Sequence, residues 1–299
     1  MSSEMARVIR PLPILPANLI SSNVPENDHT QWASGTSYAK DAWVRDEHRV
    51  YQALRSNSGN KPKDSPLDWL DGGATNQWKM FDNKVGTQTV RVGGIEVIIE
   101  QDDFVDAVSL LNILANAIRV TVTDPNEGEV YQKQIETLDA GAPDWWEYFF
   151  DPITRISDVV FDDLPPYAGV QIKVEALITA GQEARIGSLG MGSVFEIGCA
   201  RWGSSVGIRD FSVKEQDEFG NLFVQERDYS KRPEFDLVID TRRVDLVIAE
   251  LSKLRAVPCI YIAHSKFTST IAYGFYRELM IVLAYPSVSE GTLVIEGLT

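Results

Sequence analysis

Apolar and polar residues alternate along several short stretches of the chain. Ala117–Val122 alternates cleanly, and Gly169–Leu177 has an apolar residue at every second position. Val90–Ile99 alternates in the same way around a kink at Gly93-Gly94. This period of two is typical of half-buried strands, and short strands separated by turns favour packed antiparallel sheets. The pattern predicts a jelly-roll-like β-sandwich over residues 85–186.

A second β-rich region begins after a Gly/Ser-rich joint at Gly187–Gly192. Within it, Asp217–Asn221 has the composition of a hairpin tip. Residues 240–254 differ, because their apolar side chains follow the i, i+3, i+4, i+7 spacing of an amphipathic helix. We therefore expect a β-rich C-terminal domain with one helix. The pattern leaves open whether this region and the sandwich are two domains or share one core.

Residues 26–84, which we call the aromatic module, hold four of the seven tryptophans and few aliphatic residues. Two alternating stretches, Ala42–Arg45 and Arg49–Ala53, flank a polar turn and predict a pair of short strands. Residues 1–25 contain several prolines and show no periodicity, which predicts an extended arm. We expect residues Ala6–Leu19 of the arm to lie on a neighbouring subunit, where they could add a strand to a sheet.

The sequence as a whole predicts a mainly β protein with four parts. They are an extended Pro-rich arm (1–25), a small aromatic-rich β module (26–84), a jelly-roll-like sandwich (85–186) and a β-rich C-terminal domain with a helix at 240–254 (187–299).

Acidic residues dominate the charge of the chain. There are 43 Asp and Glu against 28 Lys and Arg, a net charge of −15, and most of it lies after residue 84. Nucleic-acid binding needs a basic stripe, so we expect no nucleic-acid partner, and anionic membrane surfaces are disfavoured for the same reason. The chain has no 18 consecutive apolar residues, so we expect no membrane insertion. Pro11, Pro13 and Pro16 interrupt the apolar stretch that a cleaved signal peptide would need.

The histidines, the acid pairs and the glycine-rich stretches of the sequence give no support for catalysis. His29, His48 and His264 lie far apart and lack the spacing of metal ligands. The acid pairs Asp102-Asp103 and Asp162-Asp163 do not by themselves form a glycosidase site, because adjacent residues of a strand point to opposite faces. A phosphate-loop motif is also missing. We therefore expect no catalytic residue, no metal, no cofactor and a non-enzymatic function.

The aromatic residues of the module have two interpretations. Flat aromatic faces pack against the apolar faces of sugar rings, while nearby Asn, Asp and Gln orient the hydroxyls. Alternatively, the rings are the core of a small domain that is poor in aliphatic residues. Because four Trp and two Tyr exceed what so short a module needs to bury, we favour a binding surface.

Within the module, the following residues occur in order: Trp32, Tyr38-Ala-Lys-Asp41-Ala-Trp43-Val44, Tyr51-Gln-Ala53, Pro62 and Trp69. This order resembles the family 5/12 carbohydrate-binding modules of chitinases. The resemblance implies a sugar-facing side lined by Trp32, Tyr38, Tyr51 and Trp69. Trp43 joins these candidates because it alternates with Val44, which the resemblance places in the core.

Two further segments resemble bacteriophage proteins. Thr75–Asp82 resembles a segment of phage tail proteins that carry this module, and Tyr273–Tyr276 with Ile295–Leu298 is similar to tail-tip and fibre-adaptor proteins. The resemblance implies a non-enzymatic virion structural protein of the tail tip, the baseplate or the tail–fibre junction. It would be made and assembled in the bacterial host cytoplasm. The implied partners are tail tube, tail tip or fibre proteins, further copies of the chain, and a host cell-surface glycan.

Two alternatives remain open at this point. The chain could be a secreted polysaccharide-degrading enzyme with a carbohydrate-binding module, or the module could serve only as a protein-docking wedge in the phage tail. Trp78 and Phe81 lie three residues apart, just before the sandwich, and we expect them to wedge the module onto it.

Overall fold

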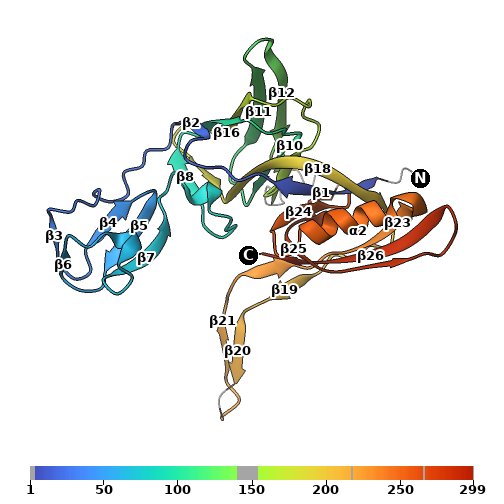
Figure 1. Ribbon diagram of the computed structural model, residues 1–299. Coiled ribbons are helices and arrows are strands. Elements are labelled where there is room, and N and C mark those ends of the chain that lie inside the picture. The colour runs from blue at the N-terminus through green and yellow to red at the C-terminus, as the bar shows by residue number, and fades with distance from the viewer. Residues whose placement is uncertain (1–3, 140–153, 217, 265–266, 299) are drawn as a thin grey trace, which may run out of the picture.

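The computed structural model describes residues 4–139, 154–216, 218–264 and 267–298. In these residues the protein is mainly β, as predicted, with several antiparallel sheets. One α-helix, α2 (Val244–Lys253), follows the 3-10 turn η3 (Thr241–Arg243) within this described part, which confirms the helix predicted at 240–254. The aromatic module lies at one side of the molecule, away from the C-terminal region that contains α2 (Figure 1).

The aromatic module is built on a three-stranded antiparallel sheet ordered β4–β5–β7 and a two-stranded ribbon, β3–β6. Both pack around a core of Val44, Tyr51, Ala53 and Trp69, so aromatic rings supply the volume that aliphatic residues would usually provide. The elements are β3 (Ser37–Tyr38), β4 (Trp43–Asp46), β5 (Arg49–Ala53), β6 (Asn57–Ser58), η1 (Pro62–Asp64) and β7 (Trp69–Ala74).

The module is joined to the sandwich through Trp78 and the short helix η2 (Lys79–Phe81). The buried ring of Trp78 lies 4.6 Å from His48 of the module and 5.4 Å from Phe81, measured between ring centroids. Phe81 and the fully buried Met80 pack into the core of the sandwich. The predicted wedge of Trp78 and Phe81 is therefore confirmed.

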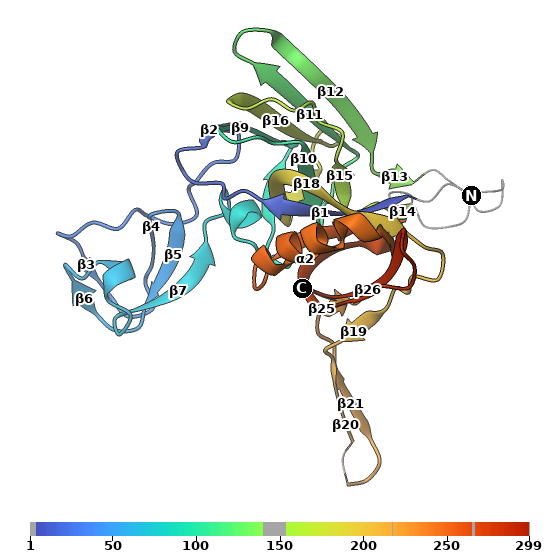
Figure 2. The same cartoon turned by 45° about the vertical axis from the view of Figure 1, so that its right-hand side comes forward.

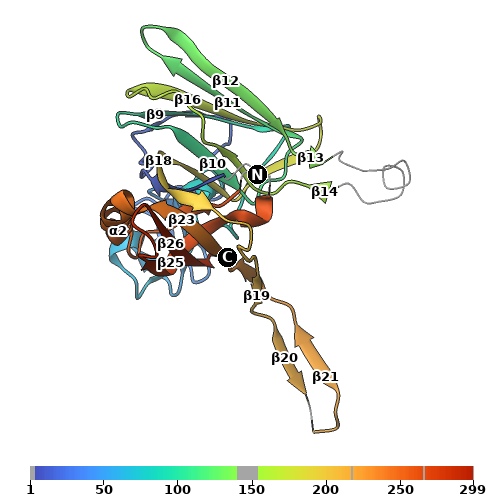
Figure 3. The same ribbon diagram turned by 90° about the vertical axis from the view of Figure 1, so that its right-hand side faces the viewer.

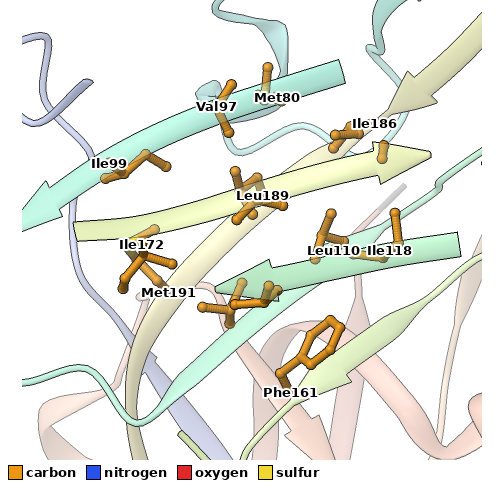
Figure 4. Packing of buried hydrophobic residues seen from close by; sticks show 14 of the residues in the cluster. Met80, Val97, Ile99, Leu110, Ile118, Phe161, Ile172, Ile186, Leu189 and Met191 are labelled. Atoms are coloured by element: carbon orange, nitrogen blue, oxygen red, sulfur yellow. The ribbon is translucent and has the colours of Figure 1, made fainter. Parts of the chain in front are cut away.

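The sandwich encloses the largest core. One layer is a five-stranded antiparallel sheet ordered β12–β11–β16–β9–β2, and β10, β15 and the first residues of β18 (Ser188–Ala200) face it. Ile99 and Ile172 from the first layer pack with Leu110 and Leu189 from the second (Figure 4). The strands of this region are β2 (Leu19–Ser22), β8 (Thr89–Val92), β9 (Ile95–Gln101), β10 (Ala107–Leu111), β11 (Ala117–Asp124), β12 (Gly128–Glu136), β13 (Leu138–Asp139), β14 (Thr154–Arg155), β15 (Val159–Phe161), β16 (Val170–Leu177) and β17 (Glu183–Ile186).

Six antiparallel strands form a closed barrel in the order β1–β24–β25–β26–β23–β18, and β18 returns to β1. Val247 and Leu251 of α2 pack into the barrel core with Phe235, Tyr261 and Leu293. The elements are β1 (Met5–Pro11), β18 (Ser188–Ala200), β23 (Glu234–Asp240), β24 (Cys259–Ile262), η4 (Thr268–Thr270), β25 (Ile271–Val282) and β26 (Val288–Gly297).

The Gly/Ser-rich stretch expected to be a joint is part of a continuous strand. Residues 188–192 of β18 pair with β10 of the sandwich, and residues 192–199 pair with β1 of the barrel. A Cβ atom at Gly192 would lie 1.8 Å from the backbone oxygen of Arg10, so glycine allows the close approach of the two chains here. The stretch is therefore not a break between strands, because β18 runs through it and connects two separate cores.

The N-terminal arm belongs to the chain's own sheets. Both edges of β1 are paired, one with β18 and the other with β24, and β2 pairs with β9 of the sandwich. The expectation that this arm adds a strand to a neighbouring subunit is therefore wrong for β1, because β1 has no free edge. The proline-containing stretch between β1 and β2 carries the chain from the barrel to the sandwich.

A long β-ribbon, formed by residues 208–216 and 218–231, extends away from the barrel (Figures 2 and 3). At its base β19 (Ile208–Asp210) pairs with β22 (Tyr229–Lys231), and farther out β20 (Val213–Gln216) pairs with β21 (Leu222–Gln225). We call this ribbon the projecting hairpin. It confirms the hairpin predicted around 217–221, of which Asp217 lies outside the described residues. An ion pair between Lys231 and Asp158 ties its base to the sandwich.

Candidate functional site

The five predicted binding residues differ widely in exposure. Trp43 is 42% exposed, Trp32 and Tyr38 are half-buried, and Tyr51 and Trp69 are only 6% and 2% exposed. The expectation that the rings of Tyr51 and Trp69 are exposed is wrong, because they complete a core that has few aliphatic side chains. Tyr38 meets Trp69 edge to face at 5.3 Å, and Trp32 packs against the same core.

Strand register places the predicted residues on two faces of the β4–β5–β7 sheet. Val44 pairs with Tyr51, so both side chains point to the inward face, whereas Trp43 pairs with Gln52 on the opposite face. This confirms the predicted outward orientation of Trp43. The structure therefore does not bring Trp43 together with Tyr51 and Trp69, and the module has two candidate surfaces.

The first candidate surface is the ring of Trp43. It stacks on His29 with 5.5 Å between ring centroids and 21° between the ring planes. A Cβ atom at Gly72 would lie 2.8 Å from the Trp43 ring, so the indole also lies close to the backbone of β7. The ring is held in place and still partly exposed, which allows it to accept one flat apolar surface of a ligand.

The second candidate surface is a pocket of about 530 Å³ beside β5 and β7. Tyr51 and Trp69 line it even though most of each ring is buried. Its other lining residues are apolar or charged, namely Pro62, Pro66, Leu70, Glu47, Arg49, Lys63 and Asp71. Aromatic and apolar walls with a few placed polar groups are typical of a small-ligand site.

An ion pair fixes the polar groups at one side of this pocket. Arg49 donates to Asp71 Oδ2 from Nη2 at 2.6 Å and from Nε at 3.0 Å, and the Gly73 N–H donates to Asp71 Oδ1 at 2.8 Å. Burial disfavours the charged carboxylate, but these hydrogen bonds outweigh it and hold the pKa of Asp71 below its usual range. The Asp71 carboxylate likewise raises the pKa of Arg49. Both groups are therefore charged at neutral pH.

The remaining charged residues of the pocket are also paired. Lys61 and Lys63 donate to the Glu47 carboxylate at 2.5 and 3.1 Å and hold the pKa of Glu47 below its usual range. Burial, with the Asp71 charge adding to it, raises the pKa of the Tyr51 hydroxyl, which therefore stays protonated. The lining has equal numbers of cations and anions, an arrangement that suits a neutral, hydroxyl-rich ligand better than an ion.

Sequence reasoning missed Arg49, Lys63 and Asp71 as members of the site. Arg49 could have been found, because it lies two residues before Tyr51 on one strand and shares its face. Nothing near Lys63 or Asp71 in the sequence indicates that they line the pocket, because η1 and the register of β7 bring them there.

The rest of the described chain adds three findings. No three His, Cys, Asp or Glu side chains in the described ranges lie together so that they could hold a metal ion. No helix in this part of the protein is long and apolar enough to span a membrane. Comparisons with protein-family models, with curated proteins and with solved structures find no match to this chain. Function is therefore inferred from the sequence and from the surfaces described above.

Proposed function

We propose that this chain is a non-enzymatic structural protein of a bacteriophage tail, at the tail tip, the baseplate or the tail–fibre junction. It docks other tail proteins and contributes to the binding of a host-surface glycan. The observation that carries the proposal is the projecting hairpin, whose apolar side chains are exposed on both of its faces. The aromatic module supplies the glycan contact.

The register of the projecting hairpin supports a role in docking. Phe223 pairs with Glu215 and Val224 pairs with Lys214, so Phe223 and Val224 point to opposite faces. They are 68% and 52% exposed, and Leu222 beside them is exposed as well. A two-stranded hairpin is at best marginally stable in water by itself. Apolar residues on both faces therefore favour a hairpin that inserts between neighbouring proteins of an assembly.

Charge and sequence resemblance support the same assignment. The net charge of −15 favours docking against proteins with basic surfaces, since opposite potentials steer association. The segments that resemble phage tail proteins, Thr75–Asp82 and Tyr273–Tyr276, belong to the junction of the module and to β25. The pocket beside Tyr51 and the ring of Trp43 provide the two kinds of surface that sugars use, one with hydrogen-bonding groups and one flat and apolar.

The proposal is tested on purified virions of the phage that encodes the chain. Gold-labelled antibodies against the chain should mark one position on the tail in electron micrographs, and mass spectrometry should detect the chain in the same particles. Antibody absorbed with purified protein is the control. If the chain is found in the lysate but not in particles, the proposal is wrong.

A further inference from the structure

We propose that the barrel carries a second saccharide site, centred on Trp202 and separate from the aromatic module. The inference rests on the proposed glycan-binding function and extends it. It is drawn from an aromatic platform, a pocket beside it and the charged groups that line the pocket.

Trp202 lies two residues beyond the end of β18 and is 70% exposed, which is unusual for a tryptophan. Its ring stacks on His264, with 5.5 Å between ring centroids and 27° between the planes. Phe267 meets both rings edge-on, 6.3 Å from Trp202 and 6.2 Å from His264. Because His264 is buried, the indole is fixed on one side and leaves a large apolar surface open to solvent.

A pocket of about 330 Å³ lies beside this ring, on the outer face of the barrel. Register places Asp236, Thr292 and Met280 side by side across β23, β26 and β25. The next row along the same face contains Glu290 and Val282. Trp202, Met280 and Val282 are all more than half exposed and supply the apolar lining of the pocket.

The polar groups of the pocket are paired with one another. Arg201 donates from Nη1 to Glu290 Oε1 at 2.8 Å, and the Thr292 hydroxyl lies 3.5 Å from Asp236 Oδ1. A carboxylate oxygen accepts more than one hydrogen bond and a guanidinium has five N–H donors, so these groups can bind further hydroxyls. The pocket thus offers acceptors and a donor next to an aromatic face.

This combination matches a saccharide. A pyranose can stack its apolar face on Trp202 while its hydroxyls donate to Asp236 and Glu290 and accept from Arg201. With Arg201 as its one cation against two carboxylates, the pocket disfavours uronate, phosphate and sulfate groups. The preferred ligand is therefore a neutral glycan. Two sites on one chain allow a long polysaccharide to bind more tightly than either site alone.

The experiment is calorimetric titration of the full chain with cellohexaose, chitohexaose and maltohexaose. We expect two sites in the unmodified chain, and Trp202→Ala should weaken one of them by about tenfold, the loss expected for one stacking ring. Tyr285→Ala, which removes an exposed aromatic ring that does not line the pocket, is the matched control and should leave both sites intact. Unchanged thermal unfolding of Trp202→Ala shows that the fold is kept.

The other outcomes overturn the inference in distinguishable ways. A single site that Trp202→Ala leaves intact, but that Trp43→Ala or Asp71→Asn weakens, refutes the barrel site and keeps the module's glycan role. Absence of binding to all three probes refutes both the barrel site and that role. If Trp202→Ala changes the oligomeric state in light scattering without affecting sugar binding, the surface around Trp202 is a protein contact instead.

Discussion

Arg49 of β5 and Asp71 of β7 form a bidentate ion pair although they are not opposite each other in the sheet. Arg49 pairs with Ala74, and Tyr51 pairs with Asp71, because the register shifts between Val50 and Tyr51. The irregularity lets the guanidinium reach diagonally to the carboxylate. The pair thereby places a donor group and an acceptor group beside the aromatic lining of the module's pocket.

Removing this pair should affect ligand binding more than folding. Both side chains are close to half exposed, so Arg49→Gln should lower the free energy of unfolding by only about 0.2–1 kcal/mol. Binding of a neutral oligosaccharide at the module should weaken severalfold, as calorimetry can measure. Arg185→Gln breaks the equally exposed pair with Glu183 in the sandwich and is the control. Equal binding losses in both variants would contradict a role in the pocket.

The same pair should make stability depend on pH. The pKa of Asp71 is lower in the folded protein than its value of about 3.9 in an unfolded chain, so the unfolded chain binds more protons between the two values. The contribution of the pair is therefore complete above about pH 5 and is lost as the pH falls through the folded pKa. Urea unfolding of the unmodified chain and of Arg49→Gln should show a difference that shrinks on acidification. A difference that does not change with pH would show that Asp71 is not the group involved.

Replacing Trp69 should mainly lower stability, whereas replacing Trp43 should mainly weaken sugar binding. Trp69 is fully packed and donates from Nε1 to the Asn60 carbonyl at 3.0 Å, so Trp69→Ala should cost about 3–5 kcal/mol of stability. Trp43 is partly exposed, and Trp43→Ala should cost less than about 1 kcal/mol while weakening sugar binding. Urea unfolding, monitored by near-ultraviolet circular dichroism, measures the loss of stability in each variant. Similar losses of stability would mean that Trp43 is a core residue.

Gly192 should tolerate no side chain. Its Cβ would collide with the Arg10 backbone, so Gly192→Ala must push β1 away from β18 and should lower stability by about 1–3 kcal/mol or more. Gly35→Ala is the control, because nothing lies within 4 Å of a Cβ at that position. Thermal unfolding compares the two variants. An unfolding temperature for Gly192→Ala equal to that of the control would rule out the close approach described here.

The projecting hairpin should be needed for assembly and dispensable for folding. Residues 211–228 can be replaced by Asn-Gly, which closes a two-residue turn between Asp210 and Tyr229, the last pair of β19 and β22. The shortened chain should keep the circular dichroism spectrum of the barrel but fail to enter virions in a complementation assay. Normal incorporation would show that the proposed docking does not use the hairpin.

The alternating strands and the helix at 240–254 could be predicted because their signals are local. Residues such as Val170 and Ile172 face the core at the period that the sequence shows. Closure of the barrel could not be predicted, since β1 pairs with residues near 195 and 261 and nothing close to β1 in the chain indicates those partners. In the site, the outward position of Trp43 followed from alternation, whereas the burial of Trp69 depends on the shortage of aliphatic residues around it.

The pairing of β1 also sets an order of events during synthesis. The first strand of the barrel is made before the module and the sandwich, yet its neighbours, residues 192–199 and 260–262, leave the ribosome much later. Until then both edges of β1 lack partners, while the module can fold from contacts within itself. We therefore expect the barrel to close after the module and the sandwich have formed.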